Sequence, residues 1–142
     1  MSICELCSES GGELLWQGER CRVVYIDEPG YAGFCRVIWT AHEKEMTDLA
    51  DDDREHLMHV VFMVESILRE QLNPLKINLA SLGNVVPHLH WHVIPRYADD
   101  PHFPQPIWAS AQREPPPSRR ARSTEALANA LARALKPVMD SS

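Results

Sequence analysis

Hydrophobic positions along this 142-residue chain follow two different spacings. Before residue 46 they gather in short stretches rich in β-branched and aromatic residues, and the first two, separated by Gly18, predict a β-hairpin. From Met46 to Leu72 apolar side chains recur three and four residues apart, which predicts an amphipathic helix that Asn73-Pro74 ends. The strands predicted in the first part are 13–17, 21–27 and 34–40.

Two more strands follow the long helix. Residues 75–81 and 86–95 are β-rich, and the glycine-containing turn 82–84 joins them. The predicted order is therefore β-β-β-α-β-β-α. Short connections between neighbouring strands favour a mainly antiparallel five-stranded sheet with helices packed on one face, which is an α+β fold.

The C-terminal part is richer in proline. Residues 98–118 have no periodicity and predict a surface loop, whereas 123–135 predicts a second amphipathic helix with Ser123 as its cap and Pro137 at its end. The expected organisation is a main domain over 1–112, a Pro- and Arg-rich linker over 113–122, and a C-terminal helical segment, 123–142, of the same domain.

Composition and charge exclude several classes of protein. The chain has 14 basic and 20 acidic side chains, a formal charge of −6, which disfavours binding to a nucleic-acid polymer. A small phosphate site needs only a few donors, so a nucleotide ligand stays compatible with this charge. No apolar run approaches the roughly 18 residues that span a bilayer, so we expect a cytoplasmic protein without a membrane partner. In that compartment the four cysteines are expected to be thiols or metal ligands.

The segment VVPHLHWHVIPR, residues 85–96, carries the main candidate chemistry. His88, His90 and His92 alternate with apolar residues, so a strand would place them on one face, about 7 Å apart. Buried imidazoles without partners are costly, so this face should be solvated, ligated or hydrogen-bonded. The opposite side chains are expected to face the long helix: Leu89, Trp91 and Val93.

Two chemical interpretations of this histidine row follow from the residues. A His-x-His pair on a strand is a common metal-binding geometry. Imidazole is also a nucleophile and a proton donor near neutral pH, so the row could be catalytic. Spacing alone does not separate the two.

The sequence HLHWHVI resembles the motif of the histidine triad family, His-Φ-His-Φ-His-Φ-Φ with Φ apolar. The resemblance extends over roughly residues 3–97. It includes an Asn and a Gly ahead of the triad, an Asp…Pro…strand…His segment, and an N-terminal Cys-x-x-Cys. Those pieces are Asn78, Gly83, the stretch IDEPGYAGFCRVIWTAH and CELC.

The resemblance implies a nucleotide hydrolase or nucleotidyl transferase. The middle histidine, His90, would attack the α-phosphate and form a nucleotidyl-histidine intermediate, which water then hydrolyses. His92 would contact a phosphate oxygen and aid the leaving group. No catalytic metal is expected. The implied substrate contacts are Asn78, Gly83, Asn84 and Asp27, and for Asp27 capping of a turn is an equal alternative.

One departure from the family pattern concerns the phosphate. Many members have Gln and then Ser or Thr after the glycine, whereas this chain has Asn84 and Val85. Val85 has no side-chain donor, so the backbone N–H groups of this turn would have to compensate.

The resemblance also implies a zinc site. In zinc-binding members the ligands correspond to Cys4, Cys7, His42 and His88, a closed Cys₂His₂ set typical of a structural metal. The alternative for CELC is a pair of reduced cysteines on a frayed terminus.

The expected substrate is a nucleoside monophosphate conjugate, most simply an adenosine phosphoramidate or dinucleoside polyphosphate. Two alternatives remain: a nucleotide-binding or interaction protein with weak catalysis, and a zinc-dependent hydrolase that uses the triad as its ligands. The resemblance further implies a homodimer. Trp108, in the Pro-rich loop, is expected to pack against the last helix, with stacking near the ligand as the alternative.

Overall fold

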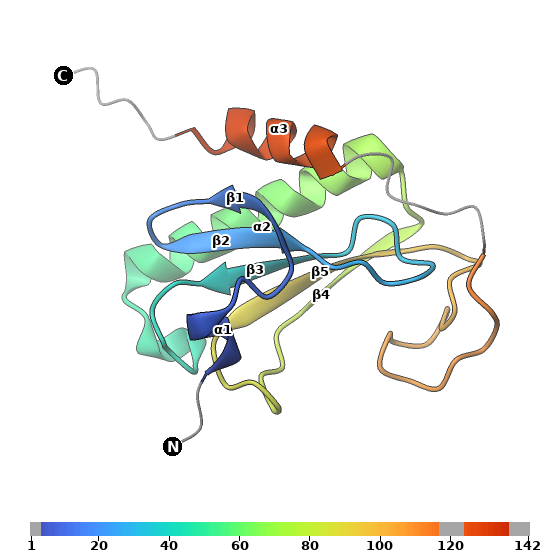
Figure 1. Ribbon diagram of the computed structural model, residues 1–142, viewed down its shortest axis with the longest axis horizontal. Helices are drawn as coiled ribbons and strands as arrows, with labels where there is room; N and C mark the ends of the chain where they lie inside the picture. Colours follow the sequence, from blue (N-terminus) through green and yellow to red (C-terminus); the bar gives the residue numbers. More distant parts are fainter. Residues whose placement is uncertain (1–3, 117–123, 137–142) are drawn as a thin grey trace.

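The computed structural model of the chain describes residues 4–116 and 124–136 (Figure 1). The predicted linker, 113–122, is described only as far as residue 116. The predicted cap Ser123 and the predicted stop Pro137 lie outside the described residues. The strands are β1 (Glu13–Gln17), β2 (Cys21–Tyr25), β3 (Cys35–Trp39), β4 (Lys76–Ala80) and β5 (His90–Arg96). The helices are α1 (Glu5–Ser8), α2 (Asp51–Leu72) and α3 (Thr124–Ala134), with a 3-10 turn, η1 (Met46–Asp48), before α2.

The five strands form one antiparallel sheet in the order β1-β2-β3-β5-β4. This confirms the predicted α+β fold class. β5 is the last strand in the sequence, but it lies between β3 and β4 in the sheet. The strand that carries His90 and His92 is therefore internal to the sheet. In its register with β3, Arg36 lies opposite His92 and Ile38 lies opposite His90.

Helices α2 and α3 pack on the same face of the sheet (Figure 1). Their apolar side chains share one core with those of the strands, including the fully buried Leu57 and Val61 of α2. Leu89 and Val93 are buried in this core and Trp91 packs against it, which confirms the predicted inward-facing set. Burial of this apolar stripe, more than helix propensity, stabilises α2.

The ends of α2 follow from its sequence. Three consecutive acidic residues, Asp51 to Asp53, occupy the first turn, where the positive end of the helix dipole stabilises negative charge. Asn73 adopts a left-handed conformation with φ of 46° and its N–H bonds to the Arg69 carbonyl, which ends the helix as predicted.

The short helix α1 was not predicted, and it lies on the face of the sheet opposite α2. Leu6 packs there against Val24 and Ile38. Arg22 also holds α1, because its Nη2 donates to the carbonyls of Leu6 and Glu9 at 2.8 and 2.9 Å. These contacts hold the N-terminal segment against the sheet.

The strand prediction around the histidines was partly wrong. We expected a strand over 86–95, but β5 begins at His90. Pro87 has no N–H to give to a ladder, and the N–H of His88 bonds locally to the Val86 carbonyl. His88 therefore precedes the strand and does not continue its row.

No helix in the described ranges combines the length and apolar character needed to cross a bilayer.

Candidate functional site

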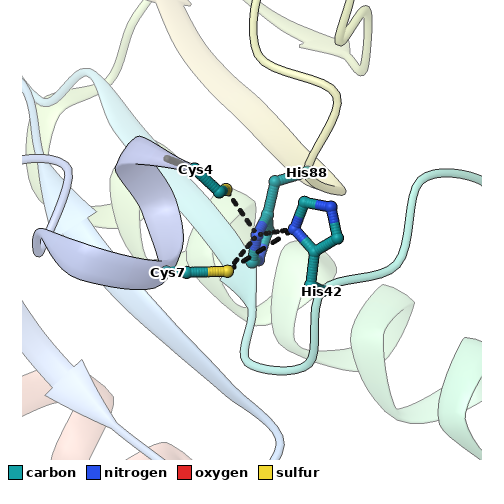
Figure 2. Close-up of side chains that lie close together, drawn as sticks. All are labelled: Cys4, Cys7, His42 and His88. Carbon is teal, nitrogen blue, oxygen red and sulfur yellow. Dashed lines mark hydrogen bonds between the residues drawn. The ribbon is translucent and has the colours of Figure 1, made fainter. Parts of the chain in front are cut away.

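Four potential metal ligands from distant parts of the chain meet beside the start of β5 (Figure 2). Cys4 and Cys7 come from the N-terminal segment around α1, His42 follows β3, and His88 precedes β5. Their ligand atoms all lie within 4.8 Å of one another. The predicted ligand set is therefore brought together, and it could hold a metal ion.

Four of the six spacings between these ligand atoms are close to those of a tetrahedral metal site. The Nδ1 atom of His88 lies 3.3 Å from Cys4 Sγ, 3.4 Å from Cys7 Sγ and 3.3 Å from His42 Nδ1. Cys7 Sγ is also 3.4 Å from His42 Nδ1. Tetrahedral zinc with thiolate and imidazole ligands separates neighbouring donors by about 3.4–3.8 Å. Four donors are enough to complete a tetrahedral coordination shell.

His88 is prepared for this role by its second nitrogen. Its Nε2 lies 2.6 Å from the Trp39 carbonyl oxygen, which can only accept, so Nε2 carries the proton and Nδ1 keeps a free lone pair. The ring is fully buried, and burial lowers the pKa of His88, which favours the neutral form that binds metals. The other two cysteines, Cys21 and Cys35, are buried free thiols whose pKa burial raises to about 12.

His90 is held by the residue two positions before it. Its Nδ1 donates to the His88 carbonyl at 2.6 Å, within the protein interior. Since Nδ1 must carry the proton, the neutral ring has its lone pair on Nε2. Burial lowers the pKa of His90, the bond to the His88 carbonyl raises it in part, and the charge of Arg36 lowers it further. His90 is therefore set as a neutral imidazole with an available nucleophilic nitrogen.

His92 lies beside His90, with ring centroids 5.0 Å apart and planes nearly perpendicular. It is 6% exposed, and its Nδ1 has no hydrogen-bond partner among the described residues. Burial, followed by the positive charge of Arg36 and then His90, lowers the pKa of His92 to about 4. The side chain is thus a neutral, buried group with an unused polar atom beside the candidate nucleophile.

This lowered pKa predicts a pH-dependent stability. Between pH 6.5 and about 4 the unfolded chain binds a proton at His92 that the folded chain does not, so the free energy of unfolding falls as the pH falls through this window. Above pH 6.5 His92 is neutral in both the folded and the unfolded chain, so its burial causes no loss of stability with pH there. A full proton corresponds to about 1.4 kcal/mol per pH unit, and solvent screening should make the observed slope smaller.

Urea unfolding of the wild type and of His92→Asn across pH 4–7 measures this difference. The variant should lose stability less steeply than the wild type as the pH falls. Acid-sensitive groups other than His92 and its neighbour His90 affect both proteins equally, so parallel curves would contradict the assignment of this slope to His92.

Asn78 lies on β4 opposite Ile94, on the same face of the sheet as the two strand histidines. Its Oδ1 accepts a 2.8 Å bond from Arg96 Nη1. The N–H groups of the Asn78 side-chain amide therefore point away from Arg96. The predicted substrate contact is therefore oriented as a donor.

Arg96 also anchors the loop that follows β5. It forms a fully buried bidentate pair with Asp100, at 2.9 and 3.0 Å. Burial would raise the pKa of Asp100, but the bonds from Arg96 and from the N–H groups of Tyr97, His102 and Phe103 outweigh it and lower the pKa to about 2. A buried pair that is this fully hydrogen-bonded is expensive to break, so the loop is held in one arrangement.

This loop carries Trp108 to the histidines. The Trp108 ring meets His92 edge to face, with centroids 5.4 Å apart, and is 53% exposed. The expectation that Trp108 packs against the last helix was therefore wrong. The position of Trp108 depends on the pairing of Arg96 with Asp100, which fixes the loop. The sequence contains both residues but does not show that they meet.

The remaining predicted substrate contacts are more exposed. Gly83 has φ of +73°, a left-handed conformation that suits glycine and turns the chain between β4 and β5. Asn84 is exposed and Val85 is 92% exposed, so the side chains of these two residues lie at the protein surface.

Asp27 is exposed and lines a groove of about 970 Å³ together with Tyr25, Tyr31 and Arg36. Arg36 connects this groove to the histidines, because it stands opposite His92 in the strand register. Arg36 was not among the predicted site residues, although a charged residue within an otherwise apolar strand was a usable signal. A second hollow, of about 590 Å³ between the end of α2 and β4, contains none of the predicted site residues.

The family model for the HIT domain, the histidine triad domain, matches residues 8–99. The chain belongs to the HIT family. Solved HIT proteins share its fold over nearly the whole length. The histidine triad protein blr8122 of Bradyrhizobium japonicum is 24% identical, with a TM-score of 0.70 over 94% of this chain and 96% of that one.

Two further HIT proteins extend this comparison. The protein SMc02904 of Sinorhizobium meliloti is 24% identical, with a TM-score of 0.71 over 93% of this chain and 95% of that one. A zinc-bound histidine triad family protein of Mycobacterium smegmatis is 21% identical, with a TM-score of 0.61 over 93% and 90% of the two chains. No curated protein matches the chain. The HIT fold supports nucleotide binding and hydrolase or transferase chemistry in general.

Proposed function

We propose that this HIT protein cleaves nucleoside monophosphate conjugates at the α-phosphate, through a nucleotidyl intermediate on His90. The substrate class is an adenosine phosphoramidate or a dinucleoside polyphosphate. Membership of the HIT family supports the general chemistry. The observation that carries the proposal is the bond from His90 Nδ1 to the His88 carbonyl, because it leaves Nε2 unprotonated and free to attack.

The reaction has two displacements. In the first, His90 Nε2 forms a bond to the α-phosphorus while the bond from phosphorus to the leaving group breaks, and the leaving group takes up a proton from solvent water. In the second, water attacks phosphorus and gives up a proton to the solvent, the P–N bond breaks, and His90 returns to its neutral form with release of the nucleoside monophosphate. Covalent catalysis of this kind divides one difficult step into two easier ones.

The neighbouring side chains support charge and orientation. His92 is neutral, adjacent to His90, and has an unused Nδ1, so it can hydrogen-bond a phosphate oxygen or the leaving group. Asn78 presents its amide donors on the same face, because Arg96 occupies its carbonyl. Asp27, in the adjoining groove, would accept hydrogen bonds from ribose hydroxyls.

Zinc has a structural role in this proposal. The residues that would hold it are Cys4, Cys7, His42 and His88, whose geometry fits a closed tetrahedral site. A HIT protein of Mycobacterium smegmatis is zinc-bound, which supports the choice of metal. Bound zinc would cross-link the N-terminal segment to the start of β5 and so help hold the His88 carbonyl against His90.

The test compares AMP release from adenosine 5′-phosphoramidate and from diadenosine tetraphosphate, with and without a chelator. We expect AMP from at least one substrate, with turnover that persists after chelation. We also expect an intact protein mass increased by one adenylyl group when the reaction is quenched in acid-free denaturant, since phosphoramidates are acid-labile.

Each alternative gives a different result in the same experiment. Turnover that disappears on chelation from a still-folded protein would contradict the proposal and favour a zinc-dependent hydrolase. Binding of AMP without turnover of either substrate would favour a nucleotide-binding protein.

A further inference from the structure

Arg36 and His92 share an unusual property. Two buried side-chain polar atoms in the described part of the chain have no hydrogen-bond partner, Arg36 Nε and His92 Nδ1. The two residues lie directly opposite each other on β3 and β5, where side chains of an antiparallel pair are about 5 Å apart at Cβ. Buried polar atoms without protein partners are rare, so two of them in one cross-strand pair make this place a candidate for contact with a ligand.

Arg36 also makes few polar contacts with the rest of the protein. No carboxylate lies within ion-pair distance of it in residues 4–116 and 124–136, and its one contact is a long 3.5 Å bond from Nη1 to the Gly11 carbonyl. Arg22, on the same face of the sheet, by contrast donates to three backbone carbonyls at 2.8–3.0 Å. Burial lowers the pKa of Arg36, as expected for a cation held partly out of water, and the negative charge of Glu5 offsets this effect in part.

The position of Arg36 connects the two halves of the site. It lines the groove that contains Asp27, and it is the one cation among the described residues that do so. It also stands beside His92, and its positive charge, after burial, lowers the pKa of both His90 and His92. A negatively charged group placed at the histidines would therefore lie within reach of the guanidinium.

We propose that Arg36 is a substrate-binding residue, whose guanidinium pairs with an oxygen of the nucleotide phosphate beside His92. This deepens the proposed function and rests on its placement of the phosphate at the histidines. Val85 has no side-chain donor, so the turn after Gly83 supplies no hydroxyl to the phosphate. Arg36 supplies a charged donor from β3, which borders β5 on the side away from β4.

The test measures the binding of AMP and adenosine, which differ by the phosphate alone. In Arg36→Met the affinity for AMP should fall about 10- to 100-fold, as for loss of a charged hydrogen bond, while the affinity for adenosine changes by less than about twofold. Arg36→Lys should recover part of the AMP affinity, since it keeps the charge but loses the planar fork. Arg69→Met, which removes an exposed arginine of α2, is the matched control and should bind both ligands as the wild type does.

Thermal unfolding separates binding from structure. Removal of an unpaired, half-buried cation should leave the melting temperature unchanged or raised, whereas a structural arginine would lower it. Equal weakening of AMP and adenosine, unchanged AMP binding in Arg36→Met, or no AMP binding by the wild type would overturn the proposal. AMP binding that depends on Arg36 in a protein without turnover would instead overturn the proposed reaction and leave this inference standing.

Discussion

Replacement of His90 by alanine is expected to reduce kcat/KM for AMP release by at least about a thousandfold, because the covalent path is lost. The adenylyl adduct should disappear with the activity. The reason is geometric. The His88 carbonyl accepts the proton on His90 Nδ1 in a hydrogen bond, so the free lone pair of the His90 ring is on Nε2. Steady-state kinetics and intact-protein mass spectrometry check both effects.

The alanine variant also removes a buried hydrogen bond to the His88 carbonyl, which costs stability of about 1–3 kcal/mol. His90→Asn is therefore the sharper variant, since its side-chain amide can still donate to that carbonyl but cannot attack phosphorus. His59→Ala, which removes an exposed histidine from α2, is the matched control and should retain full activity. Substantial turnover by a folded His90→Asn protein would refute the nucleophile assignment.

Loss of the metal centre is expected to have the largest effect on stability. The purified protein should contain about one zinc ion per chain, and Cys7→Ser should contain essentially none, because a four-ligand site is strongly weakened by removal of one thiolate. The melting temperature should fall by several degrees in the variant, since a metal that binds only the folded chain stabilises it by mass action. The site joins Cys4 and Cys7 to His88, more than 80 positions along the chain, which makes its cross-link long-range.

Metal analysis and calorimetry, each with and without chelator, measure these changes. Chelation should lower the melting temperature of the wild type to that of Cys7→Ser and should leave the variant unaffected. Cys21→Ala is the matched control, because it removes a buried thiol outside the cluster and should keep its zinc despite a cavity. A native protein without metal, or one whose zinc survives in Cys7→Ser, would rule out this site.

Local physical rules were sufficient for most of the secondary structure. The spacing of apolar residues determined α2, and Asn73 ended it, because a left-handed conformation stops a helix within a few residues. Alternation predicted that Leu89, Trp91 and Val93 face the helices, because consecutive strand residues point to opposite sides of a sheet. The error at His88 came from the same rule applied too far, since Pro87 delays the strand until His90.

The resemblance of short motifs gave the candidate ligands and histidines, but not their surroundings. The structure brings Cys4, Cys7, His42 and His88 together as expected. Arg96 and Asp100 meet only after the loop has folded, and their pairing carries Trp108 to His92. No periodicity in the Pro-rich segment encodes that contact, because it depends on packing between residues outside regular elements.

The sequence by itself determined the α+β class, the core faces and the three histidines, because these depend on spacing within single elements. The tertiary structure decided the strand order, and with it the neighbours of each histidine. Pairing of β5 with β3 placed Arg36 opposite His92. Strand order is a non-local choice governed by the packing of the whole sheet, so the cation beside the histidines became visible only when the chain was folded.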